Sequence, residues 1–375
     1  MRAPLALTLL FAAALSTAAP ARVIAHAPVN QAAIAAERPP ELLSAYRLFQ
    51  DERAREPNAG VTPYDLNTPL WSDGALKFRF VFVPPGSPAQ YDPDRVFAFP
   101  VGTVLIKTFA FAADMRRPGE AVRLLETRLL IRRESGWVTL PYVWNDAQTD
   151  AVYSPAGATF AVSFTSEDGA AVALDWHVPN RNECRACHDR AGAITPIGPN
   201  ARNLNTIWRS EPNDEGEPNE VMPVGMSINQ LRRWQALGIL DHAPADAPRV
   251  PNAYDSNDGT LDQRARAYLD VNCAHCHNPE GPGHTSGLDL SWSQSDPARW
   301  GVYKRPVAAG RGAADFAFDI EPGHPDRSIL LHRMASTDPG VMMPEIGRQL
   351  VDGRAAALMR DWIAEMDEDG SPRGR

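Results

Sequence analysis

Between about residue 60 and residue 175, apolar and polar residues alternate in short runs, the pattern of half-buried β-strands. Residues 77–83 (KFRFVFV) alternate with a period of two. Residues 127–133 and 137–140 flank a Glu-Ser-Gly turn, which is typical of a β-hairpin. Short strands interrupted by Pro and Gly favour a sandwich or a small barrel. The other predicted strands are residues 104–109, 160–164 and 172–174.

Beyond Pro179, helix signals replace the strand pattern. Residues 227–230 (SINQ) and 260–263 (TLDQ) each have the sequence of a capping box, in which Ser or Thr begins a helix and Gln follows three residues later. Asp352 is placed to cap a last helix at about 353–366, where apolar residues recur at helical spacing. The second half of the chain is therefore predicted to be mainly helical.

The first residues have the pattern of a secretory signal peptide. Arg2 precedes a short apolar run, residues 4–15, and small residues follow, so cleavage is expected after Ala21 or as late as Ala27. The run is too short to span a bilayer comfortably. We therefore expect a periplasmic protein with no membrane span in the mature chain. A net charge of −9 without a basic stripe argues against a nucleic-acid partner.

All four cysteines lie in two Cys-x-x-Cys-His motifs, residues 184–188 (CRACH) and 273–277 (CAHCH). Residues i and i+3 lie on one face of a helical turn. The two thiols can therefore form thioethers with the two vinyl groups of a haem, while the next residue, His, reaches the iron. We predict two covalent c-type haems. The predicted haem-binding residues are Cys184, Cys187, His188, Cys273, Cys276 and His277, with His188 and His277 as iron ligands.

Two other chemistries would also use paired cysteines. In an oxidising compartment each pair could close a local disulfide, but a disulfide does not need the His that follows, and no βαβ pattern surrounds either pair. A zinc site would need the pairs close together. Residues 188–272 separate them, far more than the roughly 15–20 residues of common zinc ribbons.

Methionines are candidates for the second iron ligand. Met343 precedes a proline and the last helix, and we favour it over Met342 for the second motif, because a thioether ligand suits simple electron transfer. For the first motif, Met222 and Met226 are alternatives, as are His242 and a vacant position that would admit peroxide or another small ligand. Each of these methionines could instead belong to the core.

On both motifs and on five further segments, the chain from about residue 42 to 366 resembles an uncharacterised family of exported proteobacterial dihaem c-type cytochromes. Its C-terminal part is also similar to the cytochrome c class in general. The resemblance implies haem binding and a redox role but supplies no substrate. The five segments are residues 63–73 (PYDLNTPLWSD), 99–104 (FPVGTV), 126–130 (ETRLL), 142–145 (YVWN) and 264–269 (RARAYL).

Together these observations predict a multidomain α+β fold, with a β-rich sandwich-like or barrel-like domain before a mainly α-helical, cytochrome c-like haem region. The predicted segments are 1–21 (signal peptide), 41–177 (β-rich domain), 178–250 (first haem) and 255–368 (second haem).

The predicted function is electron transfer between other periplasmic redox proteins. One alternative is a peroxidase-like dihaem enzyme with an open sixth position at the first haem, and another is a binding module built on the β-rich domain. Candidates to line a second site in that domain are Trp71, Asp73, Lys77, Lys107, Trp144 and Asn145.

Overall fold

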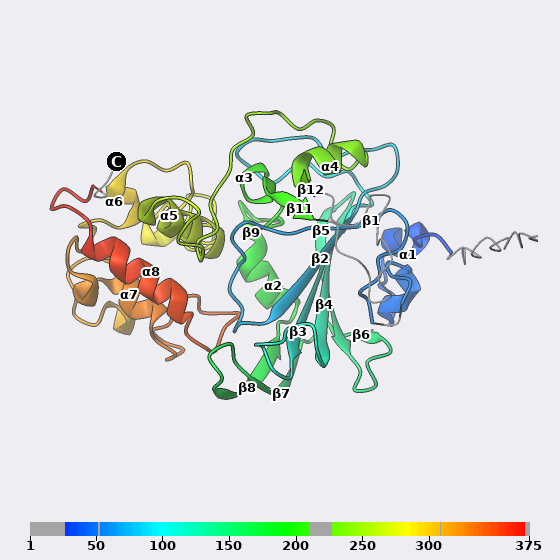
Figure 1. Ribbon diagram of the computed structural model, residues 1–375, viewed down its shortest axis with the longest axis horizontal. Coiled ribbons are helices and arrows are strands. Elements are labelled where there is room, and N and C mark those ends of the chain that lie inside the picture. The colour runs from blue at the N-terminus through cyan, green and yellow to red at the C-terminus, as the bar shows by residue number, and fades with distance from the viewer. Residues whose placement is uncertain (1–26, 52, 210–226, 308, 372–375) are drawn as a thin grey trace, which may run out of the picture.

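The computed structural model describes residues 27–51, 53–209, 227–307 and 309–371. Its largest element is an antiparallel sheet of six strands in which each strand pairs with its neighbour in sequence (Figure 1). The strands are β1 (Val61–Pro63), β2 (Leu76–Phe82), β3 (Val104–Ala112), β4 (Val122–Arg133), β5 (Gly136–Trp144) and β6 (Ala151–Tyr153). Successive side chains of a strand point to opposite faces, and in β3 every residue except Lys107 is buried, so both faces of this sheet are packed.

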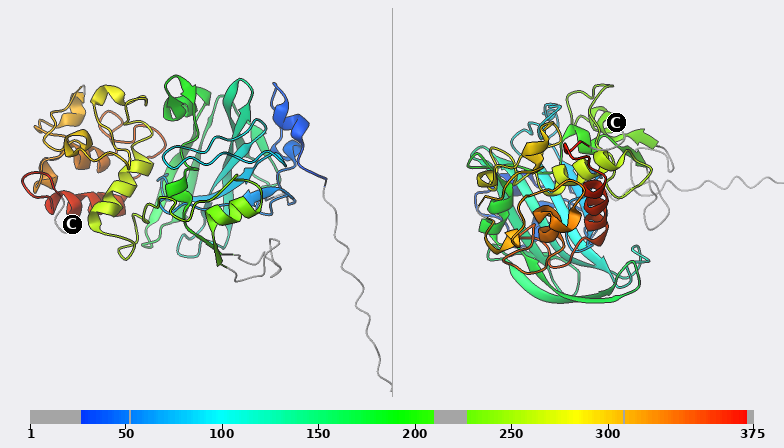
Figure 2. Two further views of the ribbon diagram at one scale, coloured as in Figure 1. Left: turned by 90° about the horizontal axis from the view of Figure 1, so that it is seen from above. Right: turned by 90° about the vertical axis from the view of Figure 1, so that its left-hand side faces the viewer.

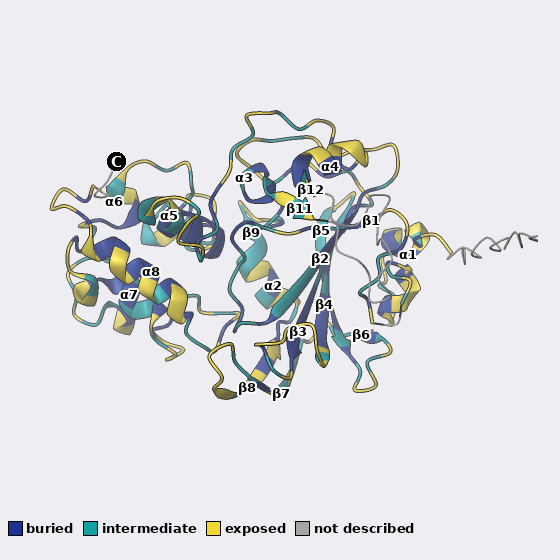
Figure 3. Cartoon of the chain, viewed as in Figure 1, coloured by how far each residue is buried: buried dark blue, intermediate teal, exposed yellow. Residues whose placement is uncertain are grey.

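One face of the sheet is covered by the N-terminal segment. Helix α1 (Gln31–Ala35) and the 3₁₀ helix η1 (Leu43–Tyr46) contribute Ile34 and Tyr46 to a core that they share with Ile106 of β3. All three side chains are at most 2% exposed. Full burial of such a side chain stabilises a fold by about 1.5–3 kcal/mol, so this layer fixes the sheet from one side. The central strands β3 and β4 are accordingly dark in Figure 3.

The opposite face carries two separate cores. Toward the start of β3, Leu105 belongs to one core together with Trp234. Toward the end of β3, Phe109 packs with Trp176 in the other core. Residues 105 and 109 point to the same side of β3, since their spacing is even. The partners of these two side chains come from two layers that are laid over this face: helices α3 (Ala201–Leu204) and α4 (Gln230–Ala236), and the hairpin of β7 (Ala158–Thr165) and β8 (Ala171–Val178).

The C-terminal region packs helix α5 (Leu261–Asn272) against helix α8 (Gly353–Ala364). Trp362 is 1% exposed, and its indole N–H donates a hydrogen bond to Asp262 at 3.0 Å. Figure 2 shows these helices gathered beside the sheet. The remaining elements are α2 (Arg181–His188), α6 (Pro297–Trp300), α7 (Ile329–Met334), η2 (His284–Ser286), η3 (Gly310–Ala313), η4 (Pro325–Arg327), β9 (Asp189–Arg190), β10 (Ala193–Ile194), β11 (Ile207–Arg209) and β12 (Ser227–Asn229).

The predicted fold class is wrong. The described chain is β-rich with antiparallel sheets, and the six main strands form an open sheet rather than a barrel. The region after Pro179 was expected to be mainly α-helical. In its described part it contains β9–β12, and its helices reach at most 12 residues, joined by irregular segments. The physical reason is that proline and glycine recur through this region, and neither continues a helix well.

The helix starts were predicted with mixed success. Thr260 and Gln263 form the expected capping box, and Asp352 caps α8. The capping box predicted at Ser227 is wrong, because Ser227 lies in β12 and the cap of α4 is Asn229. Asn is as good a cap as Ser, and the pairing of β12 with β11 occupies the residues before it.

Two predictions concern the membrane. The signal peptide with its cleavage sites lies outside the described residues. Within the described ranges, no helix is long and apolar enough to cross a bilayer.

Candidate functional site

Both Cys-x-x-Cys-His motifs open onto one cavity of about 740 Å³. Cofactors and small ligands bind in cavities of about 300–1,000 Å³. The walls come from β2–β5, from α2, and from the segments that follow α5 and precede α8. The residues predicted to bind haem, Cys184, Cys187, His188, Cys273, Cys276 and His277, all line this cavity, and so does Met343. The fold therefore brings together two motifs that are far apart in the sequence.

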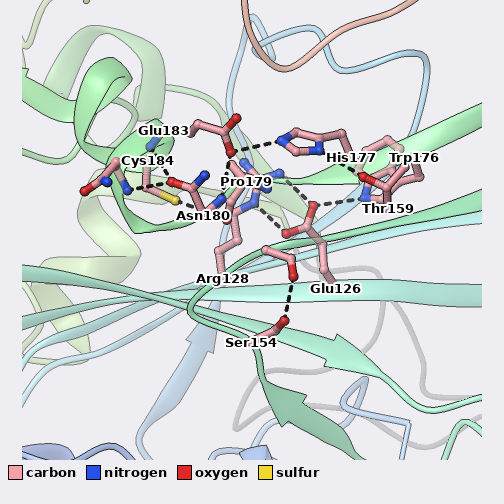
Figure 4. A network of polar contacts seen from close by, with 12 residues as sticks. Glu126, Arg128, Ser154, Thr159, Trp176, His177, Pro179, Asn180, Glu183 and Cys184 are labelled. Atoms are coloured by element: carbon pink, nitrogen blue, oxygen red, sulfur yellow. Dashed lines mark hydrogen bonds and ion pairs between the residues drawn. The ribbon is translucent and has the colours of Figure 1, made fainter.

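Helix α2 carries the first motif and begins with a capping box. The Asn180 side chain accepts hydrogen bonds from the backbone N–H groups of Asn182 and Glu183, and Glu183 accepts one from Asn180 N at 2.8 Å (Figure 4). Glu183 also bonds His177 of β8 at 2.9 Å. These contacts fix the start of α2 against the β7–β8 hairpin, and thereby the position of Cys184 one turn after Asn180.

His188 is oriented by the chain that follows it. Its Nδ1 lies 2.8 Å from the carbonyl oxygen of Thr195, and Thr195 N donates back to the His188 carbonyl at 2.8 Å. A carbonyl only accepts, so Nδ1 must carry the proton. Burial lowers the pKa of His188 to about 4, and the ring is therefore neutral with a free lone pair on Nε2. No described residue bonds that Nε2.

The second motif follows α5 directly. Residues 273–277 make one more turn, in which Cys276 N and His277 N both donate to the Cys273 carbonyl, at 3.1 and 2.9 Å. Gly283 lies against this turn. A Cβ at Gly283 would come within 3.0 Å of the Cys276 carbonyl oxygen and 3.1 Å of His277 Nδ1, so a larger residue there would press on both groups of the motif.

His277 is held by Ser286 in a comparable way. Its Nδ1 lies 3.0 Å from Ser286 Oγ, and that hydroxyl donates its only proton to the Gly283 carbonyl at 2.7 Å. His277 must therefore be the donor to Ser286, which again leaves the lone pair on Nε2. Burial lowers the pKa of His277 to about 4. Both histidines thus have the tautomer that binds a metal ion through Nε2.

The four cysteines are free thiols. Burial raises the pKa of Cys273 and Cys276 to about 12 and also raises the pKa of Cys184 and Cys187. Among the described residues, no group of three or more His, Cys, Asp or Glu could hold a metal ion. The zinc and disulfide alternatives find no support in this geometry.

The candidate methionine ligands differ in position. Met343 is half-buried and lines the cavity, whereas Met342 is 8% exposed and is not among the lining residues. Met222 and Met226 lie outside the described residues. His242 is exposed, pairs with its neighbour Asp241 at 3.0 Å, and does not line the cavity.

Arg348 fastens the loop that carries Met343. Its guanidinium donates to the backbone carbonyl of Met343 at 2.9 and 3.2 Å and to the carbonyl of Ser336 at 2.8 Å. It also bonds the carbonyls of Arg333 and Leu350. One buried side chain thus satisfies several carbonyls of an irregular loop, which holds Met343 at the cavity wall.

The two motif segments touch each other. Glu280, just after the second motif, accepts a hydrogen bond from Arg190 Nε at 2.6 Å and, through its backbone carbonyl, one from Ala191 N at 2.9 Å. His275, inside the second motif, lines the cavity with His188. Burial, followed by the proximity of His188, lowers the pKa of His275 to about 4. The sequence reasoning missed His275, although it stands inside the CAHCH motif.

The candidates for a second site in the β-rich domain divide between two places. Trp71, Asp73 and Lys107 line the cavity, whereas Trp144 packs in the core on the other face of the sheet. Lys77 and Asn145 are not among the lining residues. Sequence reasoning missed Arg79, Arg128, Thr195 and Ser286. Arg79 and Arg128 could have been recognised, because each lies two positions from another charged residue in a strand that is otherwise rich in apolar residues. No sequence signal points to Thr195 or Ser286.

Comparisons with protein-family models, with curated proteins and with solved structures found no match for this chain. The functional argument therefore depends on the residues themselves.

Proposed function

We propose that this chain is an exported dihaem c-type cytochrome that carries electrons between redox partners. The observation that supports the proposal most strongly is the pair of neutral histidines, His188 and His277. Each has Nδ1 bonded to the protein and its Nε2 lone pair left free, and each lines one cavity together with the cysteines of its motif. This donor set suits haem iron held by a proximal imidazole.

The residues present fit two covalent haems. Each cysteine would add its S–H across a vinyl group, so that a C–S bond forms, the hydrogen passes to the neighbouring vinyl carbon, and nothing leaves. Thr195 and Ser286 would orient the two imidazoles and increase their basicity. Met343 would be the sixth ligand at the second motif. The group itself supplies one-electron chemistry, and the protein sets its ligands and excludes water.

Contact between the two motif segments favours a relay over two independent sites. The Arg190–Glu280 pair and the Ala191–Glu280 backbone bond join the segments directly. The acidic net charge suits a basic redox partner. The resemblance to exported dihaem cytochromes points in the same direction, and it remains part of this proposal.

A pyridine haemochrome assay combined with an intact-protein mass tests the proposal. We expect two covalent haems per chain. The double variants Cys184→Ala/Cys187→Ala and Cys273→Ala/Cys276→Ala should each retain one haem, and His242→Ala, which changes an exposed histidine, should retain both. A wild-type chain without covalent haem, purified from a host that matures c-type cytochromes, would refute the proposal.

A peroxidase-like enzyme is the second candidate, and one observation favours it. The methionines that line the cavity in the described part of the chain, Met334 and Met343, come from the C-terminal region. On the sheet side, the groups near His188 are cations rather than methionines. The charges of Lys107 and Arg128 add to burial in lowering the pKa of His188. If the first haem lacks a sixth ligand, the resting protein should have a high-spin signal and bind cyanide. A protein with two low-spin haems that does not bind cyanide would exclude this candidate.

A further inference from the structure

Three cationic side chains stand side by side across the central sheet. Arg79 on β2 lies directly opposite Lys107 on β3, and Lys107 lies directly opposite Arg128 on β4. We call these three residues the cation row. All three line the cavity that contains the two motifs. Like charges directly opposite each other on neighbouring strands are destabilising, so the arrangement requires an explanation.

Apolar residues flank the cation row on both sides. Two residues before Lys107 on β3, Leu105 belongs to the core beneath α3 and α4. Two residues after Lys107, Phe109 belongs to the core beneath the β7–β8 hairpin. Lys107 Nζ lies 4.7 Å, and the Arg128 guanidinium 4.4 Å, from the centre of the Phe109 ring. In the adjoining row of the same face, Phe109 lies between Lys77 on β2 and Glu126 on β4. That row contains one cation and one carboxylate, so the excess of positive charge lies in the cation row.

The acidic residues nearby neutralise only part of this band. Arg128 makes a bidentate pair with the fully buried Glu126, at 2.6 and 2.7 Å. The nearest carboxylate to Arg79 is Asp65, at 3.7 Å, and its side chain is 70% exposed, so water screens this pair. Lys107 makes no hydrogen bond or ion pair with any described residue. Its ammonium is therefore without a counter-charge at the cavity wall.

We propose that the cation row is a carboxylate-binding site on the wall of the cavity. The fork of an Arg guanidinium matches the two oxygens of a carboxylate, and a Lys ammonium adds a point charge beside it. Burial and the neighbouring Arg79 lower the pKa of Lys107, and a bound anion would offset this repulsion. The cavity around the row is lined largely by apolar side chains such as Leu130, Leu105 and Trp71. It therefore suits an apolar molecule that carries one or two carboxylates.

Two molecules could supply the carboxylate. One is the haem attached at Cys184 and Cys187, through its propionate groups, and this source rests on the proposed function. The other is a free small carboxylate that enters the cavity, and this source does not. The experiment below separates them.

The test compares wild-type protein, as isolated, with three variants. Lys107→Gln removes the unpaired charge, and Lys107→Arg keeps it. The matched control Arg123→Gln removes a half-exposed cation from the same sheet, outside the cavity lining. The first measurement is the reduction potential of each haem by spectroelectrochemical titration. The second is the thermal unfolding midpoint as sodium acetate replaces sodium chloride at constant ionic strength.

If haem propionates occupy the site, Lys107→Gln should shift the reduction equilibrium of one haem about tenfold toward the oxidised form, about 59 mV for one electron. Lys107→Arg and Arg123→Gln should leave it unchanged, and acetate should have no effect. If a free carboxylate occupies the site, acetate should raise the midpoint saturably in every protein except Lys107→Gln. The proposal is overturned if Lys107→Gln matches Arg123→Gln in both measurements. Were the chain to carry no haem, the acetate measurement alone would decide.

Discussion

The carboxylate of Asp73 accepts a hydrogen bond from the backbone N–H of Leu350 at 2.7 Å. The same oxygen accepts a second bond from Gln349 N, also at 2.7 Å. Asp73 precedes β2, whereas the two donors belong to the loop between Met343 and α8. One buried side chain thus joins the central sheet to the loop that carries the proposed methionine ligand.

Replacing Asp73 tests this connection. Asp73→Ala should lower the free energy of unfolding by about 1–3 kcal/mol, because it leaves two partly buried N–H groups without their acceptor. Asp73→Asn should cost much less, since the amide oxygen can still accept and Asn tolerates the positive φ of 51° at this position. Chemical denaturation of both variants measures the difference. Equal losses in the two variants would contradict the role assigned to the oxygen.

Met343 and Met342 form a matched pair for testing the sixth ligand. Met343→Ala should abolish the methionine–iron charge-transfer band of the oxidised protein and lower the potential of one haem, because a thioether ligand raises it. Met342→Ala should keep the band but destabilise the fold by about 2–5 kcal/mol, as truncation of a buried methionine does. A band that survives in Met343→Ala and disappears in Met342→Ala would reverse the assignment.

Local sequence signals were sufficient where the chemistry is local. Each of these signals is contained in a short stretch of sequence. They are the motifs at 184–188 and 273–277, the capping box at Thr260, and the strands that alternate polar and apolar residues. The capping box at Ser227 failed because a tertiary contact, the pairing of β12 with β11, decides where α4 begins.

The parts of the site that could not be predicted depend on register and on long-range contacts. Arg79, Lys107 and Arg128 meet only because β2, β3 and β4 pair in one particular register. A shift of one residue would turn Lys107 to the other face. The bond from Asp73 to Leu350 spans most of the chain and leaves no local signal. The fold class was predicted wrongly because capping boxes and helical spacing at a few places were extended to the whole region after Pro179. The prolines and glycines of that region do not allow long helices.

Ser286 provides a test of how His277 is tuned. Ser286→Ala removes the acceptor of His277 Nδ1–H and so makes the imidazole less basic. A less basic ligand stabilises oxidised iron less, so the potential of one haem should rise, by less than about 59 mV. Ser256→Ala, a change at an exposed serine outside the cavity lining, should leave both potentials unchanged, and Ser286→Thr should restore the wild-type value. A fall in potential in Ser286→Ala would contradict the proposed donor role of His277.

Lys77 predicts how stability depends on pH above neutrality. Burial first, and then the charge of Arg79, lowers the pKa of Lys77 from its ordinary value of 10.5 to about 7. Between these values the unfolded chain binds a proton that the folded chain has lost, so stability should rise with pH, by at most about 1.4 kcal/mol per pH unit. Urea denaturation from pH 7 to 9 should therefore reveal a steeper rise in wild type than in Lys77→Met, in which only Lys107, whose pKa is also lowered, still contributes such a rise. Lys304→Met, which removes a lysine paired with Asp319 at 3.1 Å, should keep the rise. Parallel curves for wild type and Lys77→Met would mean that Lys77 keeps its charge in the fold.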